Sequence, residues 1–88
     1  MDSEYVDLLI RCDEIWQLIR NLQPGRARLD ATKMHKNVES NLSLMGKELV
    51  ECKRRQSISQ KYLTLKQQTV EMLDHIEQYI TLGILISP

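Results

Sequence analysis

Apolar side chains recur along the first part of the chain at alternating spacings of three and four residues. This spacing places them on one stripe of an α-helix, which repeats every ~3.6 residues. With Asp2 or Ser3 as the N-terminal cap, the pattern predicts a first helix over about residues 3–23. Leu9 and Trp16 widen the stripe, whose predicted core positions are Tyr5, Leu8, Cys12, Ile15, Ile19 and Leu22.

The helical pattern is then interrupted by Pro24 and Gly25, which predict a turn over residues 24–29. No proline occurs between Pro24 and Pro88, so the sequence permits a long second helix over about residues 30–85. Its first half has a stripe that we predict packs on the first helix, made of Met34, Val38, Leu42, Met45 and Leu49. Its second half has a separate stripe made of Ile58, Tyr62, Leu65, Met72, Ile76 and Tyr79.

The two stripes of the second helix are out of register with each other. Cys52 and Ile58 are six residues apart, whereas a continuous heptad pattern would separate them by seven. A slip of this kind predicts a kink near residues 53–58. Gly46 is a second weak point, because glycine in a helix interior costs ~1 kcal/mol relative to alanine.

The predicted helices differ greatly in length, about 30 Å for the first and more than about 80 Å for an unbroken second. The expected fold is therefore all-α, an antiparallel helical hairpin whose long second helix extends beyond its partner. The stripe from Ile58 to Tyr79 then lacks cover within the chain and is the predicted partner interface. We expect a coiled-coil oligomer, formed by self-association as a dimer or tetramer or with helices of other proteins. The alternative is a chain that folds back at the slip as a three-helix bundle.

The charges change this picture little, because 12 basic and 12 acidic side chains cancel to a net charge of zero. Nucleic acid and anionic membranes are therefore not attracted over long distances. Cys12 and Cys52 are too few for a disulfide framework, and the N-terminus does not resemble a secretory signal. These features favour an intracellular protein of the cytoplasm or nucleus, with no transmembrane segment.

Residues suited to catalysis or metal binding are scarce. His35 and His75 lie forty residues apart without ligand partners at suitable spacing, and we expect both on solvated helix faces. Cys12 and Cys52 fall on the apolar stripes and are expected to be inert buried thiols. The sequence therefore predicts no catalytic residue, no cofactor, no metal site and no small-molecule substrate.

The sharpest charge cluster is Lys53, Arg54 and Arg55, extended by Lys61 and Lys66. In the hairpin it falls next to the acidic start of the first helix, which accounts for the cluster without a ligand. An alternative function uses these cations to bind nucleic acid or an acidic surface, although no aromatic stacking platform accompanies them. Arg54 and Arg55 also make Ser57 a candidate phosphorylation site for a basophilic kinase.

Taken together, the patterns predict one helical domain over residues 1–88 that acts without catalysis, as a structural or scaffold subunit of a larger complex. Its expected action is protein–protein assembly through coiled-coil helices. We find no motif that selects a particular complex or family.

Overall fold

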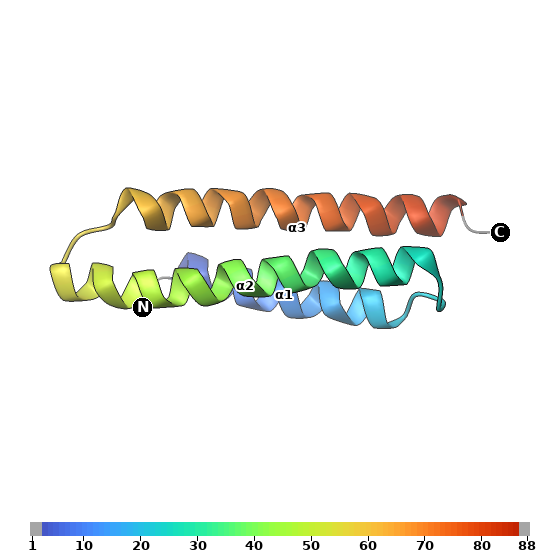
Figure 1. The fold of residues 1–88 in the computed structure, drawn as a ribbon, viewed down its shortest axis with the longest axis horizontal. Helices are drawn as coiled ribbons and strands as arrows, with labels where there is room; N and C mark the ends of the chain where they lie inside the picture. Colours follow the sequence, from blue (N-terminus) through green and yellow to red (C-terminus); the bar gives the residue numbers. More distant parts are fainter. Residues whose placement is uncertain (1–2, 87–88) are drawn as a thin grey trace.

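The computed structural model of the chain describes residues 3–86, with side chains described over residues 3–82. Its three α-helices are α1 (Ser3–Arg20), α2 (Arg26–Arg55) and α3 (Gln60–Ile86). Each helix packs against the other two, and the bundle measures 52 × 18 × 17 Å (Figure 1). The described part of the chain is all-helical, and it folds back on itself as in the three-helix alternative.

The single long second helix is replaced by two helices joined at residues 56–59. Gln56 ends α2 in the left-handed conformation (φ 58°, ψ 33°), and its N–H donates to the carbonyls of Cys52 and Lys53. The Ser57 N–H also donates to the Cys52 carbonyl at 3.1 Å, so the carbonyls at the end of α2 have hydrogen-bond partners. The register slip therefore coincides with a reversal of the chain, which brings α3 back alongside α2.

Ser59 begins α3 as its N-terminal cap. Its hydroxyl oxygen accepts from the Tyr62 N–H at 3.1 Å and its hydroxyl donates to Glu48 Oε1 at 2.9 Å. A serine at this position satisfies one of the free amides of the first turn. The cap thus fixes the start of α3 and ties it to α2.

The first turn is shorter and earlier than the predicted turn over residues 24–29, because α1 ends at Arg20 and α2 already begins at Arg26. Good helix-forming residues follow Gly25, and the Leu29 N–H donates to the Gly25 carbonyl at 3.1 Å. Asp30, where the second helix was predicted to begin, lies inside α2. There it pairs with Arg26 at 3.2 Å and accepts the Tyr79 hydroxyl at 3.0 Å.

The core runs along the axis of the bundle and receives side chains from all three helices. The predicted hairpin residues are either buried or packed against this core: Tyr5, Leu8, Cys12, Ile15, Ile19, Leu22, Met34, Val38, Leu42, Met45 and Leu49. On α3 the fully buried side chains are Tyr62, Thr69, Leu73 and Ile76, with Ile80 3% exposed. Leu73 and Ile80 were absent from the predicted stripe. The buried face of α3 is therefore rotated toward these two residues relative to the prediction.

Arg11 joins α1 to α3 through two carboxylates. Its Nη2 lies 2.5 Å from Asp74 Oδ1 and its Nε lies 2.9 Å from Glu77 Oε1. Partial burial disfavours the charge of Arg11, but the hydrogen bonds and charges of Glu77 and Asp74 outweigh it and raise the pKa of Arg11. The pairs are partly exposed and contribute about 0–1 kcal/mol each, so they orient α3 more than they stabilise it.

Candidate functional site

A groove lies between α1 and α2 and consists of two adjoining hollows. Asp13, Trp16, His35 and Glu39 are among the residues that line the first hollow. Val6, Val50, Lys53 and Ile58 are among those that line the second, which also borders the α2–α3 linker. Tyr5 and Leu9 line both hollows, so the two form one continuous feature, here called the α1–α2 groove.

Unequal helix lengths produce the open end of this groove. α1 has 18 residues and α2 has 30, about 27 Å against about 45 Å. The Tyr5 hydroxyl near the start of α1 donates to the Leu42 carbonyl at 3.3 Å. The last turns of α2 therefore extend beyond the start of α1, as Figure 1 shows at the end of the bundle nearest the α2–α3 linker.

The open end of the groove is apolar and accessible. Leu9, Val50 and Ile58 are 41%, 66% and 56% exposed, although each is a large aliphatic side chain. Contiguous exposed apolar side chains beside a hollow are typical of surfaces that bind another molecule. The open end is therefore the part of the described surface best suited to binding.

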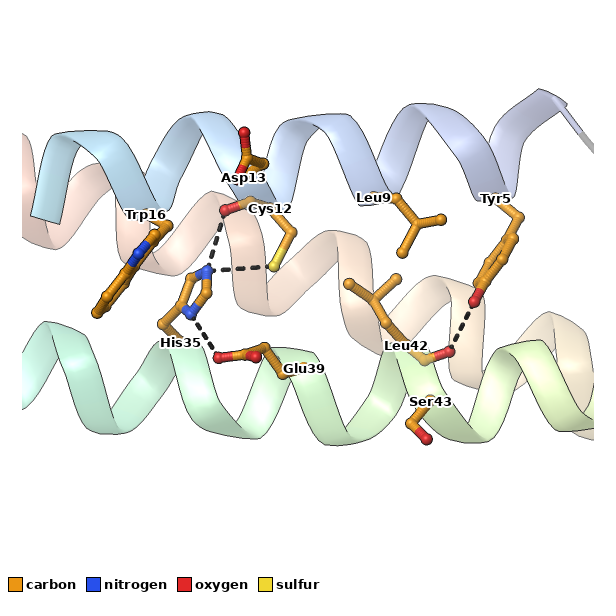
Figure 2. A pocket seen from close by; sticks show the side chains of 9 residues that line it. All are labelled: Tyr5, Leu9, Cys12, Asp13, Trp16, His35, Glu39, Leu42 and Ser43. Carbon is orange, nitrogen blue, oxygen red and sulfur yellow. Dashed lines mark hydrogen bonds and ion pairs between the residues drawn. The ribbon is translucent and has the colours of Figure 1, made fainter.

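The other hollow contains a buried polar cluster, shown in Figure 2. His35 is only 5% exposed, with Nε2 lying 3.0 Å from the Cys12 carbonyl oxygen and 3.2 Å from Cys12 Sγ. His35 Nδ1 lies 3.0 Å from Glu39 Oε1, and the ring packs against Trp16 with centroids 5.1 Å apart. The expectation of a solvated His35 is thus wrong, because α1 covers this face of α2; His75 is exposed as expected.

The order of thiol, imidazole and carboxylate resembles a nucleophilic triad, but the details oppose that use. A carbonyl only accepts hydrogen bonds, so a His35 Nε2–H that donates to the Cys12 carbonyl cannot also take the thiol proton. Burial first, then the charges of Glu39 and Asp13, raise the pKa of Cys12 to about 11. The thiol therefore stays protonated near neutral pH, and the cluster satisfies buried polar groups between α1 and α2.

The helical walls also offer no oxyanion hole at this cluster, because amides inside an α-helix donate to carbonyls of their own helix. Among the described residues, no group of three or more His, Cys, Asp or Glu side chains is arranged to hold a metal ion. The cluster is best described as a packing contact with satisfied polar atoms.

The structure places most of the predicted partner interface inside the chain's own fold. Tyr62 and Ile76 are buried in the core, while Leu65, Met72 and Tyr79 pack against it. The expectation that this stripe lacks intramolecular cover is corrected, because α3 folds back and α1 and α2 cover it. Ile58 alone of the six is exposed, and it lies in the α2–α3 linker beside the open end of the groove.

The basic cluster surrounds the same end of the bundle, and most of its cations meet carboxylates of the chain. Arg54 lies 2.9 Å and Arg55 3.9 Å from Glu51, and Lys61 lies 3.9 Å from Glu48. Lys66 pairs with Glu4. Lys53 lines the groove and has no ion pair with any residue that the structure describes.

Ser57 lies in the non-helical linker after Gln56, is exposed, and also lines the open end of the groove. Its phosphorylation remains a prediction. A phosphate there would add nearly two negative charges beside Lys53 and so change the charge of the groove.

Sequence reasoning missed Val6 and Val50 as surface residues of interest. The available signal was the length difference between the helices, which leaves the end of α2 beyond the start of α1.

Among the described residues, no helix combines the length and apolar content that crossing a membrane requires. Searches for related proteins found no family model, no curated protein and no solved structure that matches the chain.

Proposed function

We propose that the chain is a non-enzymatic assembly module that binds another protein through the α1–α2 groove. The observation that carries this proposal is the exposure of Leu9, Val50 and Ile58 along the open end of the groove. Covering one such side chain is worth about 1.5–3 kcal/mol, so a partner that covers all three gains substantial binding energy. The predicted role in a larger complex is thus kept, with the binding surface moved from α3 to the groove.

The shape of the groove suits a helical partner. Two packed helices form a channel in which the ridges of a further helix fit. His35 and Lys53 line opposite ends of the groove on α2, and the stretch they bound is about 27 Å long at ~1.5 Å per residue. A helix of about 18 residues would fill it, and at the open end it would cover the part of α2 that α1 leaves exposed.

Cys12 and Cys52 are both free and buried, which suits a reducing compartment. We therefore propose that the protein acts in the cytoplasm or nucleus. The alternative in which the 53–66 cluster binds nucleic acid receives less support, because Arg54, Arg55, Lys61 and Lys66 each lie near a carboxylate of the chain itself.

A photo-crosslinking amino acid placed at Val50 tests the proposal in the cells that make the protein. The matched control places it at Leu44, which is also exposed on α2 (46%) and does not line the groove. We expect protein adducts from position 50 and few from position 44, identified by mass spectrometry. Equal yields at both positions, or no protein adduct at position 50, would refute binding through the groove.

A further inference from the structure

The α1–α2 groove has opposite charges at its two ends. Asp13 and Glu39 line the end near the α1–α2 turn, and Lys53 lines the end near the α2–α3 linker. Glu39 and Lys53 are each seven residues from Gly46 along α2. Seven residues are close to two helical turns, so Glu39 and Lys53 lie on the same side of α2, about 21 Å apart along its axis.

The stretch between these charges is apolar. Leu9 and Val50 lie there, both exposed, with Val6 half-buried beside them. The groove therefore reads, from one end to the other, as negative, apolar and positive. A partner surface that fits it must present the same three features in reverse order.

We propose that the occupant of the groove is α2 of a second copy of this chain, packed antiparallel about a twofold axis that passes near Gly46. This inference rests on the proposed function and names the partner of the same surface. In a twofold interface, if residue i contacts residue j of the other copy, then j also contacts i. An antiparallel arrangement places Lys53 of each copy opposite Asp13 and Glu39 of the other.

The same charges disfavour the alternative parallel arrangement. It would place Lys53 beside the second copy's Lys53, and the carboxylates beside carboxylates, which is repulsive at both ends. The antiparallel arrangement also brings the apolar stretches of the two copies together at the centre. The dimer thereby buries apolar surface that stays exposed in each single bundle. This burial adds to the limited core of a chain of 88 residues.

Sedimentation of the purified chain over a range of concentrations tests this proposal, with single and paired charge reversals. We expect a dimer for the natural sequence. Lys53→Glu and Asp13→Lys should each weaken it about tenfold, because each change affects both symmetric ends of the interface. The double variant again pairs opposite charges at positions 53 and 13 while Glu39 is unchanged, so its dimer should be tighter than that of Lys53→Glu.

Two matched variants separate this interface from a general effect of the substitutions. Lys47→Glu reverses an exposed cation that does not line the groove, and Leu44→Asp places a charge on another exposed face of α2. Both should leave the dimer intact, whereas Val50→Asp should dissociate it. Circular dichroism of each variant verifies that the bundle remains helical.

A chain that stays monomeric at every concentration overturns the proposal, as does a dimer that is indifferent to Lys53→Glu and Asp13→Lys. A double variant that dimerises no more tightly than Lys53→Glu also overturns it. These results are distinct from failure of the proposed function. If the purified chain is monomeric while position 50 crosslinks to a different protein in cells, the groove binds protein but a second copy is not the occupant.

Discussion

Gly46 and Tyr5 offer a direct test of how α1 packs on α2. A Cβ atom at position 46 would lie 2.7 Å from the Tyr5 hydroxyl oxygen and 3.5 Å from Tyr5 Cζ. The first distance is a clash, whereas the second is an ordinary van der Waals contact. Gly46→Ala should therefore force the Tyr5 side chain to move, and the hydroxyl then loses its hydrogen bond to the Leu42 carbonyl.

The expected free energies follow from these contacts. Alanine in place of glycine inside a helix stabilises it by ~1 kcal/mol. In the natural background this gain is offset by the lost hydrogen bond, about 0.5–1.5 kcal/mol, and by the displaced Tyr5 ring. We expect Gly46→Ala to be neutral or destabilising by about 1 kcal/mol there. In a Tyr5→Phe background the clashing atom is absent, and Gly46→Ala should stabilise by about 1 kcal/mol.

Urea unfolding followed by far-ultraviolet circular dichroism measures all four members of this double-mutant cycle. All four proteins should be measured at the same concentration, low enough for the chain to be monomeric, because association adds to apparent stability. The coupling free energy should be about 1–2 kcal/mol. If Gly46→Ala has the same effect in both backgrounds, within about 0.5 kcal/mol, the packing of Tyr5 over Gly46 is wrong.

Two further predictions concern the buried polar cluster. Because the pKa of Cys12 is about 11 in the fold against an ordinary 9.0, the folded state binds more protons between these pH values, and the free energy of unfolding should fall as pH rises from about 9 to about 11. Cys12→Ala should remove that part of the pH dependence in unfolding curves; an unchanged slope would contradict the assignment. His35→Ala removes a buried ring that contacts Trp16 and should lower the free energy of unfolding by about 2–4 kcal/mol. The exposed His75→Ala is its control and should change stability by less than about 0.5 kcal/mol, so equal effects of the two would refute the burial of His35.

The sequence predicted the packing of α1 on α2 because apolar spacing reports it directly. Positions such as Ile15, Val38 and Met45 repeat at helical intervals, and the structure buries them. His35 lies on the same stripe, between Ala31 and Val38 at spacings of four and three. The spacing was therefore sufficient to place it, and its polarity misled the interpretation.

The course of the chain after α2 was harder to predict for a backbone reason. The linker over residues 56–59 contains neither glycine nor proline, the residues that usually mark a reversal. The turn depends instead on Gln56 in a left-handed conformation, which costs a residue with a side chain about 1–2 kcal/mol. Packing of α3 on the other helices offsets this cost, and the apolar spacing of α3 does not show which helices cover it.

The groove escaped prediction because its existence depends on that same reversal. With α3 folded back, the apolar residues of α3 find cover, and the uncovered surface becomes the strip that α1 fails to reach. Ile58 was expected on a helical interface and instead lies in the linker at the edge of this strip. The prediction of an exposed apolar surface used the length difference between the first two helices, and the structure has that difference. Which apolar residues stay exposed, however, depends on where α3 packs.

The left-handed Gln56 also bears on the exchange of helices between copies. If residues 56–59 all took helical angles, α2 would continue into α3, and Gln56 would recover about 1–2 kcal/mol of backbone energy. Leu73, Ile76 and Ile80 would then lose cover worth about 1.5–3 kcal/mol each, so an isolated chain keeps its bend. In a pair of chains, however, α3 of one copy can fill the place vacated by α3 of the other, and no core contact is lost. The conformation of the short linker over residues 56–59 thus separates a self-contained bundle from a helix-swapped pair.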